Sequence, residues 1–445
     1  MKKRIISLIL IFIIVFSLFS PTTASAYQIT GVDLHCEAAM LVSLDTGDVL
    51  FTKNAQKRMY PASITTLLTA VVVIESAEDF ENGTITYTKS ANNLILGTGS
   101  VVLGLKVGEE IAVKDAVAAT LVSSCGDAAY ALAEHIGGSK EGFAELMNQK
   151  AQEIGLTNSH FTNPIGLHDE EHYSTAEDIY ILAKYAFSNE FIKKCLSSAS
   201  YKLGATNMRP EKTIVTSNLM INPNTSVYYK LAVWGKTGFT DEAGRCLVSI
   251  ASNQGYNYIA VTLGTATPGG VRYEFLDSAN MFRWAFNNFE YKSVLAKNTP
   301  VAEAKVELSF ETDHVTVGLE GGLEALLPKD ADSSTIKIKP RLSSDTFKAP
   351  IEKGQKMGEA DIYYAEEKIG TVNLVATRQV KANGFLIIAR SLKDFLTSTV
   401  MKIVYVAVAL AIIIFTIVVI ELNHSKKRHR KVKYKPISKK EIDKE

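Results

Sequence analysis

The sequence predicts an α/β domain in which an antiparallel sheet packs with helices, then a small all-β domain and one C-terminal transmembrane helix. Three observations predict this fold class. Between residues 39 and 289 a hairpin pattern comes first, helical patterns follow, and strands with a last helix end the segment. Between residues 300 and 380 apolar and polar residues tend to alternate with a period of two. Residues 403–420 carry no charged side chain.

The composition indicates a folded chain of more than one domain. The protein has 445 residues, of which 47% are hydrophobic and 21% are charged. The net charge of +1 hides an uneven distribution, because residues 27–420 contain 35 basic and 43 acidic residues. An acidic body argues against nucleic acid as a partner.

The N-terminus has the three parts of a secretory signal peptide. Lys2, Lys3 and Arg4 precede a mostly apolar run that ends at Phe19, and small residues follow up to Ala26. This arrangement predicts a signal peptide over residues 1–26 that is cleaved after Ala26. An uncleaved membrane anchor is the alternative.

The C-terminus predicts a membrane anchor. At 1.5 Å per residue, a helix over residues 403–420 nearly crosses a hydrocarbon layer of ~30 Å. The basic run 426–431 stays in the cytoplasm by the positive-inside rule, which places the body outside and the basic tail, residues 421–445, inside. Helical apolar spacing in the linker 383–402 indicates an interfacial helix. A buried helix of a soluble protein is the alternative to the anchor.

The first domain is expected over residues 27–295. Residues 39–51 have the pattern of a hairpin around a Thr-Gly-Asp turn, and Pro61 opens an apolar helix that continues to Val73. The remaining expected elements are two adjoining helices within 111–136, a helix at 175–187, strands at 231–233, 245–252 and 258–264, and a helix at 274–289.

The second domain is expected over residues 300–382. Five short segments tend to alternate apolar and polar residues, and Gly and Pro separate several of them. These expected strands lie at 305–310, 314–319, 335–339, 360–364 and 371–375.

Three short elements contain residue types that support nucleophilic chemistry. Ser63 stands at the start of the apolar helix, where free backbone N–H groups and the positive end of the helix dipole stabilise a developing oxyanion. Ser124 lies between the two adjoining helices, and Lys236-Thr237-Gly238 lies on or beside a strand. Each element alone also has an ordinary interpretation, as a helix cap, a turn and a chance tripeptide.

In order and spacing, the three elements resemble the active-site motifs S-x-x-K, S-x-N and K-T-G of the serine-type D-alanyl-D-alanine carboxypeptidases, the low-molecular-mass penicillin-binding proteins. The flanking sequences at 59–63, 163–176 and 234–244 are similar to those of the family, and 349–358 is similar to its accessory domain. The resemblance covers about residues 30–420 and implies a penicillin-binding, β-lactamase-like transpeptidase fold.

The resemblance implies a function in peptidoglycan metabolism. It implies a catalytic site of Ser63, Ser124 and Lys236, and a substrate-binding K-T-G strand in which Lys236, Thr237 and Gly238 hold the substrate carboxylate and its peptide. The implied ligands are cell-wall stem peptides that end in D-alanine, and β-lactams. No cofactor and no metal are expected, and the sequence assigns no protein partner.

Two positions depart from the family motifs. Thr66 stands where S-x-x-K requires the lysine that takes the proton of the serine, and Gly126 stands where S-x-N requires asparagine. No lysine occurs within 64–73, and a threonine hydroxyl is not basic at neutral pH. General acid–base assistance is worth about 10²–10⁴-fold, so catalysis is expected to be impaired.

Several functions therefore stay open. One is a hydrolase that forms an acyl intermediate on Ser63, with Lys236 acting through Ser124 as a substitute base. The loss of the second cation near Lys236 predicts a higher pKa for its amine, which argues against that route. The alternative is a non-catalytic protein on the same scaffold, which binds peptidoglycan or a partner. A β-lactamase is a weaker third hypothesis, since it would also need the lysine that Thr66 replaces.

Some other reactive residue types have plainer interpretations. His168 and His172 are expected in a loop rather than in a metal site, and Asp127 is expected to cap a helix. Cys125 is interpreted as a packed thiol rather than a nucleophile, and the four cysteines are either buried free thiols or disulfides. Tyr60 and Trp234 are expected to pack near the cleft.

Overall fold

The computed structural model describes residues 33–432, so the predicted signal peptide, residues 1–26, lies outside the described residues. The chain divides into two compact units. The first unit runs to Lys292 and also contains Leu326–Ala331. The second unit contains Ser293–Ala325 and the chain from Asp332 onward.

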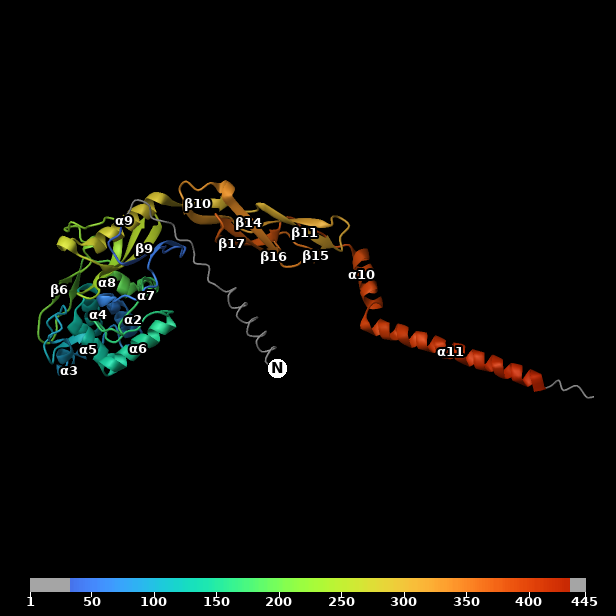
Figure 1. The fold of residues 1–445 in the computed structure, drawn as a ribbon, viewed down its shortest axis with the longest axis horizontal. Coiled ribbons are helices and arrows are strands. Elements are labelled where there is room, and N and C mark those ends of the chain that lie inside the picture. The colour runs from blue at the N-terminus through green and yellow to red at the C-terminus, as the bar shows by residue number, and fades with distance from the viewer. Residues whose placement is uncertain (1–32, 433–445) are drawn as a thin grey trace, which may run out of the picture. The chain divides into compact units, whose positions relative to one another are not determined.

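The first unit is built on a five-stranded antiparallel sheet with the strand order β2-β1-β9-β8-β7. The central strand, β9, is labelled in Figure 1. The predicted hairpin is confirmed, because β1 pairs antiparallel with β2. The strand expected at 231–233 is longer than predicted: it is β7, which lies at the edge of the sheet and includes the whole K-T-G tripeptide. The strands are β1 (Ala38–Ser43), β2 (Val49–Lys53), β7 (Ala232–Thr240), β8 (Gly244–Asn253) and β9 (Tyr256–Thr265).

The helices of this unit begin and end at residues suited to those positions. Ser139 and Thr175 accept backbone N–H bonds at the starts of two helices, and Gly138 ends another with a φ of 72°. The helices are α2 (Thr66–Ser76), α3 (Lys89–Ile95), α4 (Val113–Val122), α5 (Gly126–Gly137), α6 (Lys140–Glu153), α7 (Ala176–Ser188), α8 (Glu190–Leu196) and α9 (Tyr273–Asn288). Short 3-10 turns lie at η2 (Ala62–Thr65), η3 (Leu219–Ile221) and η4 (Pro268–Gly270). Two small sheets have two strands each: β3 (Thr84–Thr86) pairs with β4 (Glu110–Ala112), and β5 (Ser200–Leu203) pairs with β6 (Lys212–Val215).

The sheet is buried on both faces because helices pack on both. Met40 and Val42 of β1 belong to the larger core with α2 and α4–α8. Ala39 and Leu41, which point to the opposite face, belong to a second core with Phe282 of α9. This alternation explains why β1 has a continuous apolar run rather than an apolar and polar alternation.

The second unit contains a six-stranded sheet with the order β14-β16-β17-β12-β11-β15. Its buried apolar residues, among them Val315, Val317, Ala360 and Ile362, alternate along their strands and form one core. The strands are β11 (Pro300–Glu307), β12 (His314–Leu319), β14 (Ile336–Leu342), β15 (Thr346–Lys348), β16 (Lys356–Tyr364) and β17 (Glu367–Ala376), while β10 (Phe289–Leu295) pairs with β13 (Leu323–Pro328). The sequence analysis did not predict β10, β13 or β15.

Two helices follow the β-domain. Asn383 caps α10 (Gly384–Leu396) by accepting two backbone N–H bonds. The next helix, α11 (Thr399–Val432), contains the segment Thr399–Ser425, which is long and apolar enough to cross a membrane. This segment is a candidate membrane span that includes the predicted residues 403–420.

Burial predicts which leucines support the first unit. Leu41 is fully buried in β1, so Leu41→Ala should lower the free energy of unfolding by about 2–5 kcal/mol. Leu96 is 65% exposed, so the matched change Leu96→Ala should stay within about 0.5 kcal/mol of the wild type. Urea denaturation of the full chain in detergent, followed by tryptophan fluorescence, reports on this unit because Trp234 and Trp284 both lie in it. Equal effects of the two changes would contradict the assignment of the core.

Candidate functional site

A cleft of about 340 Å³ lies between the turn that carries Ser63, the α4–α5 junction and the edge strand β7. It brings together Ser63, Ser124, Thr237 and Gly238, which are far apart in the sequence. The other lining residues are Gly99, Ser100, Val101, Ser123, Ile165, Gly166, Leu167, Ser217, Phe239, Thr240, Arg245 and Arg272.

The turn that carries Ser63 is held in an unusual backbone conformation. Ala62 has a φ of 47°, in the left-handed region that is costly for a residue with a side chain. Two glycines permit the close packing around it. A Cβ at Gly166 would stand 1.8 Å from the carbonyl oxygen of Ala62, and one at Gly238 would stand 2.7 Å from that of Pro61. Ser63 is therefore positioned by contacts that only glycine allows.

Thr66 is bound to the backbone and does not line the cleft. Its Oγ1 donates a hydrogen bond of 2.8 Å to the carbonyl oxygen of Ser63, and the residue is buried. This is the usual back-bonding of a threonine near a helix start. The residue one helical turn after Ser63 thus has a hydroxyl that is already hydrogen-bonded to the main chain.

The side chain of Lys236 contacts Ser124. Its Nζ is 2.5 Å from Ser124 Oγ and donates a bond of 3.0 Å to the carbonyl oxygen of Thr237. Lys236 is fully buried, and loss of solvation lowers its pKa to about 7. The expectation of a raised pKa was wrong, because it considered the missing cation and not the burial of the amine.

The Ile95 side chain would have to move before Gly126 could be replaced by the asparagine of the family motif. A Cβ at this position would stand 2.6 Å from Ile95 Cδ1. Gly126 N–H donates to the carbonyl oxygen of Val101 in the wall of the cleft. The space of the missing side chain is therefore filled by Ile95, which is itself buried.

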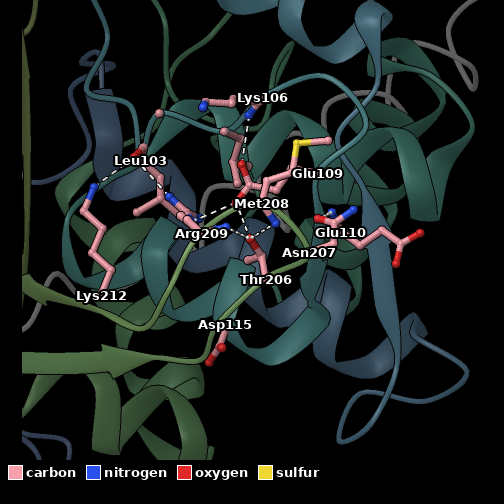
Figure 2. A network of polar contacts seen from close by, with 12 residues as sticks. Leu103, Lys106, Glu109, Glu110, Asp115, Thr206, Asn207, Met208, Arg209 and Lys212 are labelled. Carbon is pink, nitrogen blue, oxygen red and sulfur yellow. Dashed lines mark hydrogen bonds and ion pairs between the residues drawn. The ribbon is translucent and has the colours of Figure 1, made fainter.

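The wall formed by residues 99–105 is fixed by a polar network (Figure 2). Arg209 and Lys212 both donate to the carbonyl oxygen of Leu103, and Arg209 forms a 2.8 Å ion pair with buried Glu109. Thr206 also donates to Glu109. The network joins the chain around β5 and β6 to the loop that lines the cleft.

Asp127 has a different position from the one expected. The capping position of α5 is Cys125, and Asp127 lies in the first turn. Its buried carboxylate accepts N–H bonds of 2.8–3.0 Å from Leu103, Gly104 and Leu105. The residue thus anchors the cleft loop to α5 rather than serving as the N-cap.

The loop that contains His168 and His172 packs against the turn that carries Ser63. His172 is buried, its Nδ1 accepts from Thr162 N–H at 3.1 Å, and its Nε2 is 2.9 Å from Thr65 Oγ1. Burial lowers the pKa of His172 to about 4, so the ring is neutral and Nε2–H donates to Thr65. His168 packs edge-on against Tyr60, as expected for a loop residue.

The cysteines and Trp234 are packing residues. All four cysteines are buried free thiols. Burial raises the pKa of Cys125 to about 12, so its thiol stays protonated at neutral pH. Trp234 is fully buried and packs edge-on against Phe187.

Three lining residues were missed by the sequence analysis. Ser217 Oγ accepts a 2.6 Å bond from Thr237 Oγ1, and Arg245 and Arg272 contribute cations. Arg245 lies opposite Phe239 in the β7–β8 register, so pairing the two strands through the intervening turn would have placed it beside K-T-G. No comparable pattern indicated Ser217 or Arg272.

Comparison with known proteins gives the same assignment for both parts of the chain. Residues 22–267 match the D-alanyl-D-alanine carboxypeptidase family, and residues 289–382 match the penicillin-binding protein 5 C-terminal domain. D-alanyl-D-alanine carboxypeptidase DacF of Bacillus subtilis (strain 168) is 30% identical over 387 residues, covering 86% of this chain and 96% of the relative. DacC of Escherichia coli (strain K12) is 28% identical over 379 residues, covering 83% and 90%.

Solved structures share the fold. D-alanyl-D-alanine carboxypeptidase DacD from Francisella tularensis superposes with a TM-score of 0.62 at 25% identity, covering 81% of this chain and 97% of that one. Penicillin-binding protein 5 from Haemophilus influenzae superposes with a TM-score of 0.61 at 27% identity, covering 80% and 100%. The first unit therefore has the penicillin-binding transpeptidase fold, and the chain belongs to the D-alanyl-D-alanine carboxypeptidase family.

Proposed function

We propose that this protein binds cell-wall stem peptides ending in D-alanine, and β-lactams, in the cleft at Ser63, and that it turns them over slowly. The observation that carries the proposal is the state of Thr66. Its hydroxyl is bonded to the carbonyl oxygen of Ser63 and has no basicity to offer the nucleophile. Ser63, Ser124 and the edge strand β7 are nevertheless gathered in one cleft.

Slow acylation would use Lys236 and Ser124 as a substitute base. With a pKa of about 7, roughly half of the Lys236 amines are neutral at neutral pH. A neutral Nζ accepts the proton of Ser124 Oγ, which lies 2.5 Å away, while Ser124 takes the proton of Ser63 during attack on the carbonyl. The two-step transfer is less direct than one to a lysine at position 66, so the reaction is slow.

Membrane anchoring would place this site outside the cytoplasm. The span Thr399–Ser425 is followed by the basic run 426–431, which favours a cytoplasmic tail. In α10 four exposed apolar residues recur at helical spacing and suit the interface between lipid and water. These residues are Phe385, Ile388, Leu392 and Phe395. The predicted signal peptide, residues 1–26, would direct the body across the membrane.

A non-catalytic binding protein is the second candidate function. Thr66 favours it, and so does Ile95, which occupies the space next to Gly126. In that case the cleft holds a peptide without forming an acyl bond. The two candidates differ in a covalent product on Ser63.

Covalent labelling separates these candidates. Full-length protein in detergent should label slowly with a fluorescent penicillin, and Ser63→Ala should lose the label because no nucleophile remains. The control Ser188→Ala removes an exposed serine on α7 and should label like the wild type. Rapid labelling with release of D-alanine from a D-Ala-D-Ala peptide would refute impaired catalysis. A complete lack of covalent label, with peptide still bound, would establish the non-catalytic function.

Restoring the two family motifs should raise the rate by different amounts. Thr66→Lys supplies an amine at the correct helical spacing and should raise acylation, by up to about 10²–10⁴-fold. Adding Gly126→Asn should give less than the full further gain, because the Ile95 side chain must first move away from the new Cβ, which would stand 2.6 Å from its Cδ1. Adding Ile95→Val removes that carbon and should release the benefit of asparagine. Stopped-flow labelling measures the acylation rates of the three variants and so gives their order. An equal rate for all three would contradict the steric explanation.

The pH dependence should report on Lys236. The neutral amine is the deprotonated form, so the labelling rate should rise with pH and level off above a midpoint near the pKa of about 7. Lys236→Arg keeps a cation that does not lose its proton in this range, and it should remove the rise. Labelling rates from pH 5.5 to 9 give the profile. A rate in the wild type that does not change with pH would exclude Lys236 as the base.

A further inference from the structure

The asparagine that the S-x-N motif lacks would have been a hydrogen-bond donor in the cleft. An asparagine side chain offers two N–H donors and one carbonyl acceptor, whereas Gly126 offers no side chain. An extended peptide beside β7 presents every second carbonyl oxygen away from that strand, toward the α4–α5 junction and the loop 99–101. Such an oxygen loses water in the cleft and needs another donor there.

Ser100 lies beside the place that the motif leaves open. Its Cβ is 3.5 Å from the position that a Cβ at Gly126 would take, and the residue lines the cleft. The next residue, Val101, accepts the N–H bond of Gly126 at 2.8 Å, and Asp127 holds the same loop at Leu103. Ser100 is therefore fixed next to the start of α5, where the second motif lies.

The hydroxyl of Ser100 has a proton to offer. Thr98 Oγ1 donates to Ser100 Oγ at 3.0 Å, and the backbone N–H of Ser100 donates to Thr98 Oγ1 at 3.3 Å. Among residues 33–432 no acceptor is found for the hydroxyl proton of Ser100. Because the residue is only partly buried, this proton is accessible to a ligand in the cleft.

The other serines of the cleft are engaged elsewhere. Ser123 Oγ donates to a backbone carbonyl oxygen of β6 at 2.7 Å. Ser217 Oγ bonds to Thr237 Oγ1 at 2.6 Å, so it belongs to the β7 side of the cleft. Ser63 and Ser124 take part in the proposed reaction itself. Ser100 is thus the serine that is both next to Gly126 and free to donate.

We propose that Ser100 replaces the donor that Gly126 lacks, and that its hydroxyl binds an amide carbonyl oxygen of the ligand. This inference rests on the proposed function, because it concerns the same cleft. The carbonyl is the one that precedes the residue under attack. A stem peptide has it before the first of its two D-alanines, and benzylpenicillin has the corresponding carbonyl in its side chain.

Two ligands that differ in this carbonyl test the assignment. Full-length protein carrying Ser63→Ala, in detergent, is titrated with benzylpenicillin and with penicillanic acid, which lacks the side-chain amide. Competition with a fluorescent peptide ending in D-Ala-D-Ala gives the affinities. Ser100→Ala should weaken benzylpenicillin about 3–10-fold, as expected for one hydrogen bond, and leave penicillanic acid unchanged. Ser100→Thr keeps the hydroxyl and should recover part of the affinity.

A second test supplies the asparagine itself. When Ile95→Val and Gly126→Asn are added to the Ser63→Ala parent, the new amide provides the donor. Ser100→Ala should then change the affinity for benzylpenicillin by less than about twofold, because two groups that serve one acceptor are not additive. A loss as large as that in the parent would show that the two side chains act independently, and would contradict the replacement.

The matched control is Ser90→Ala, which removes an exposed serine from α3, the helix that precedes this loop. It should bind both ligands like the parent. Equal weakening of both ligands by Ser100→Ala, or weakening of neither, would overturn the role of Ser100. If the fluorescent peptide does not bind the parent, and penicillin does not label Ser63-intact protein, the proposed function fails and this inference with it. Tryptophan fluorescence confirms that each variant is folded.

Discussion

The close approach of β7 to the turn that carries Ser63 is the constraint on which the site depends. Gly238 permits this approach, since a Cβ there would stand 2.7 Å from the carbonyl oxygen of Pro61 and 3.1 Å from Ser63 N. The same strand carries Lys236, whose Nζ contacts Ser124 Oγ. The glycine at position 238 thus lets the strand that carries Lys236 pack directly against the turn of Ser63, in which Ala62 has a strained backbone.

The two departures from the family motifs are accommodated by their surroundings rather than left as gaps. Thr66 satisfies its hydroxyl on the carbonyl oxygen of Ser63, and Ile95 fills the space beside Gly126. A polar atom without a partner or an empty space would each cost stability, and neither is present at these two positions. The local packing therefore accommodates Thr66 and Gly126 without an evident cost to the fold.

The sequence predicts the fold well because periodicity and family resemblance both depend on local patterns. The hairpin at β1 and β2, the adjoining helices α4 and α5, and the alternating strands of the β-domain all follow from such patterns. The pKa of Lys236, the loop-anchoring role of Asp127 and the position of Ser217 do not. They depend on burial and on contacts between segments that are distant in sequence, such as the 2.6 Å bond between Thr237 and Ser217.

A buried amine distinguishes the two candidate functions in physical terms. Burial of Lys236 is unfavourable for its charged form and lowers the pKa of the amine, which bonds to Ser124 Oγ and to the carbonyl oxygen of Thr237. A cleft that only held peptides would gain nothing from an amine that its ligand cannot reach, and an apolar side chain of similar length would fill the space more stably. A lysine with a lowered pKa, bonded to a serine in the cleft, is instead suited to accept a proton near neutral pH. Of the two proposed functions, the geometry of Lys236 therefore favours the one with slow turnover over the one with binding alone.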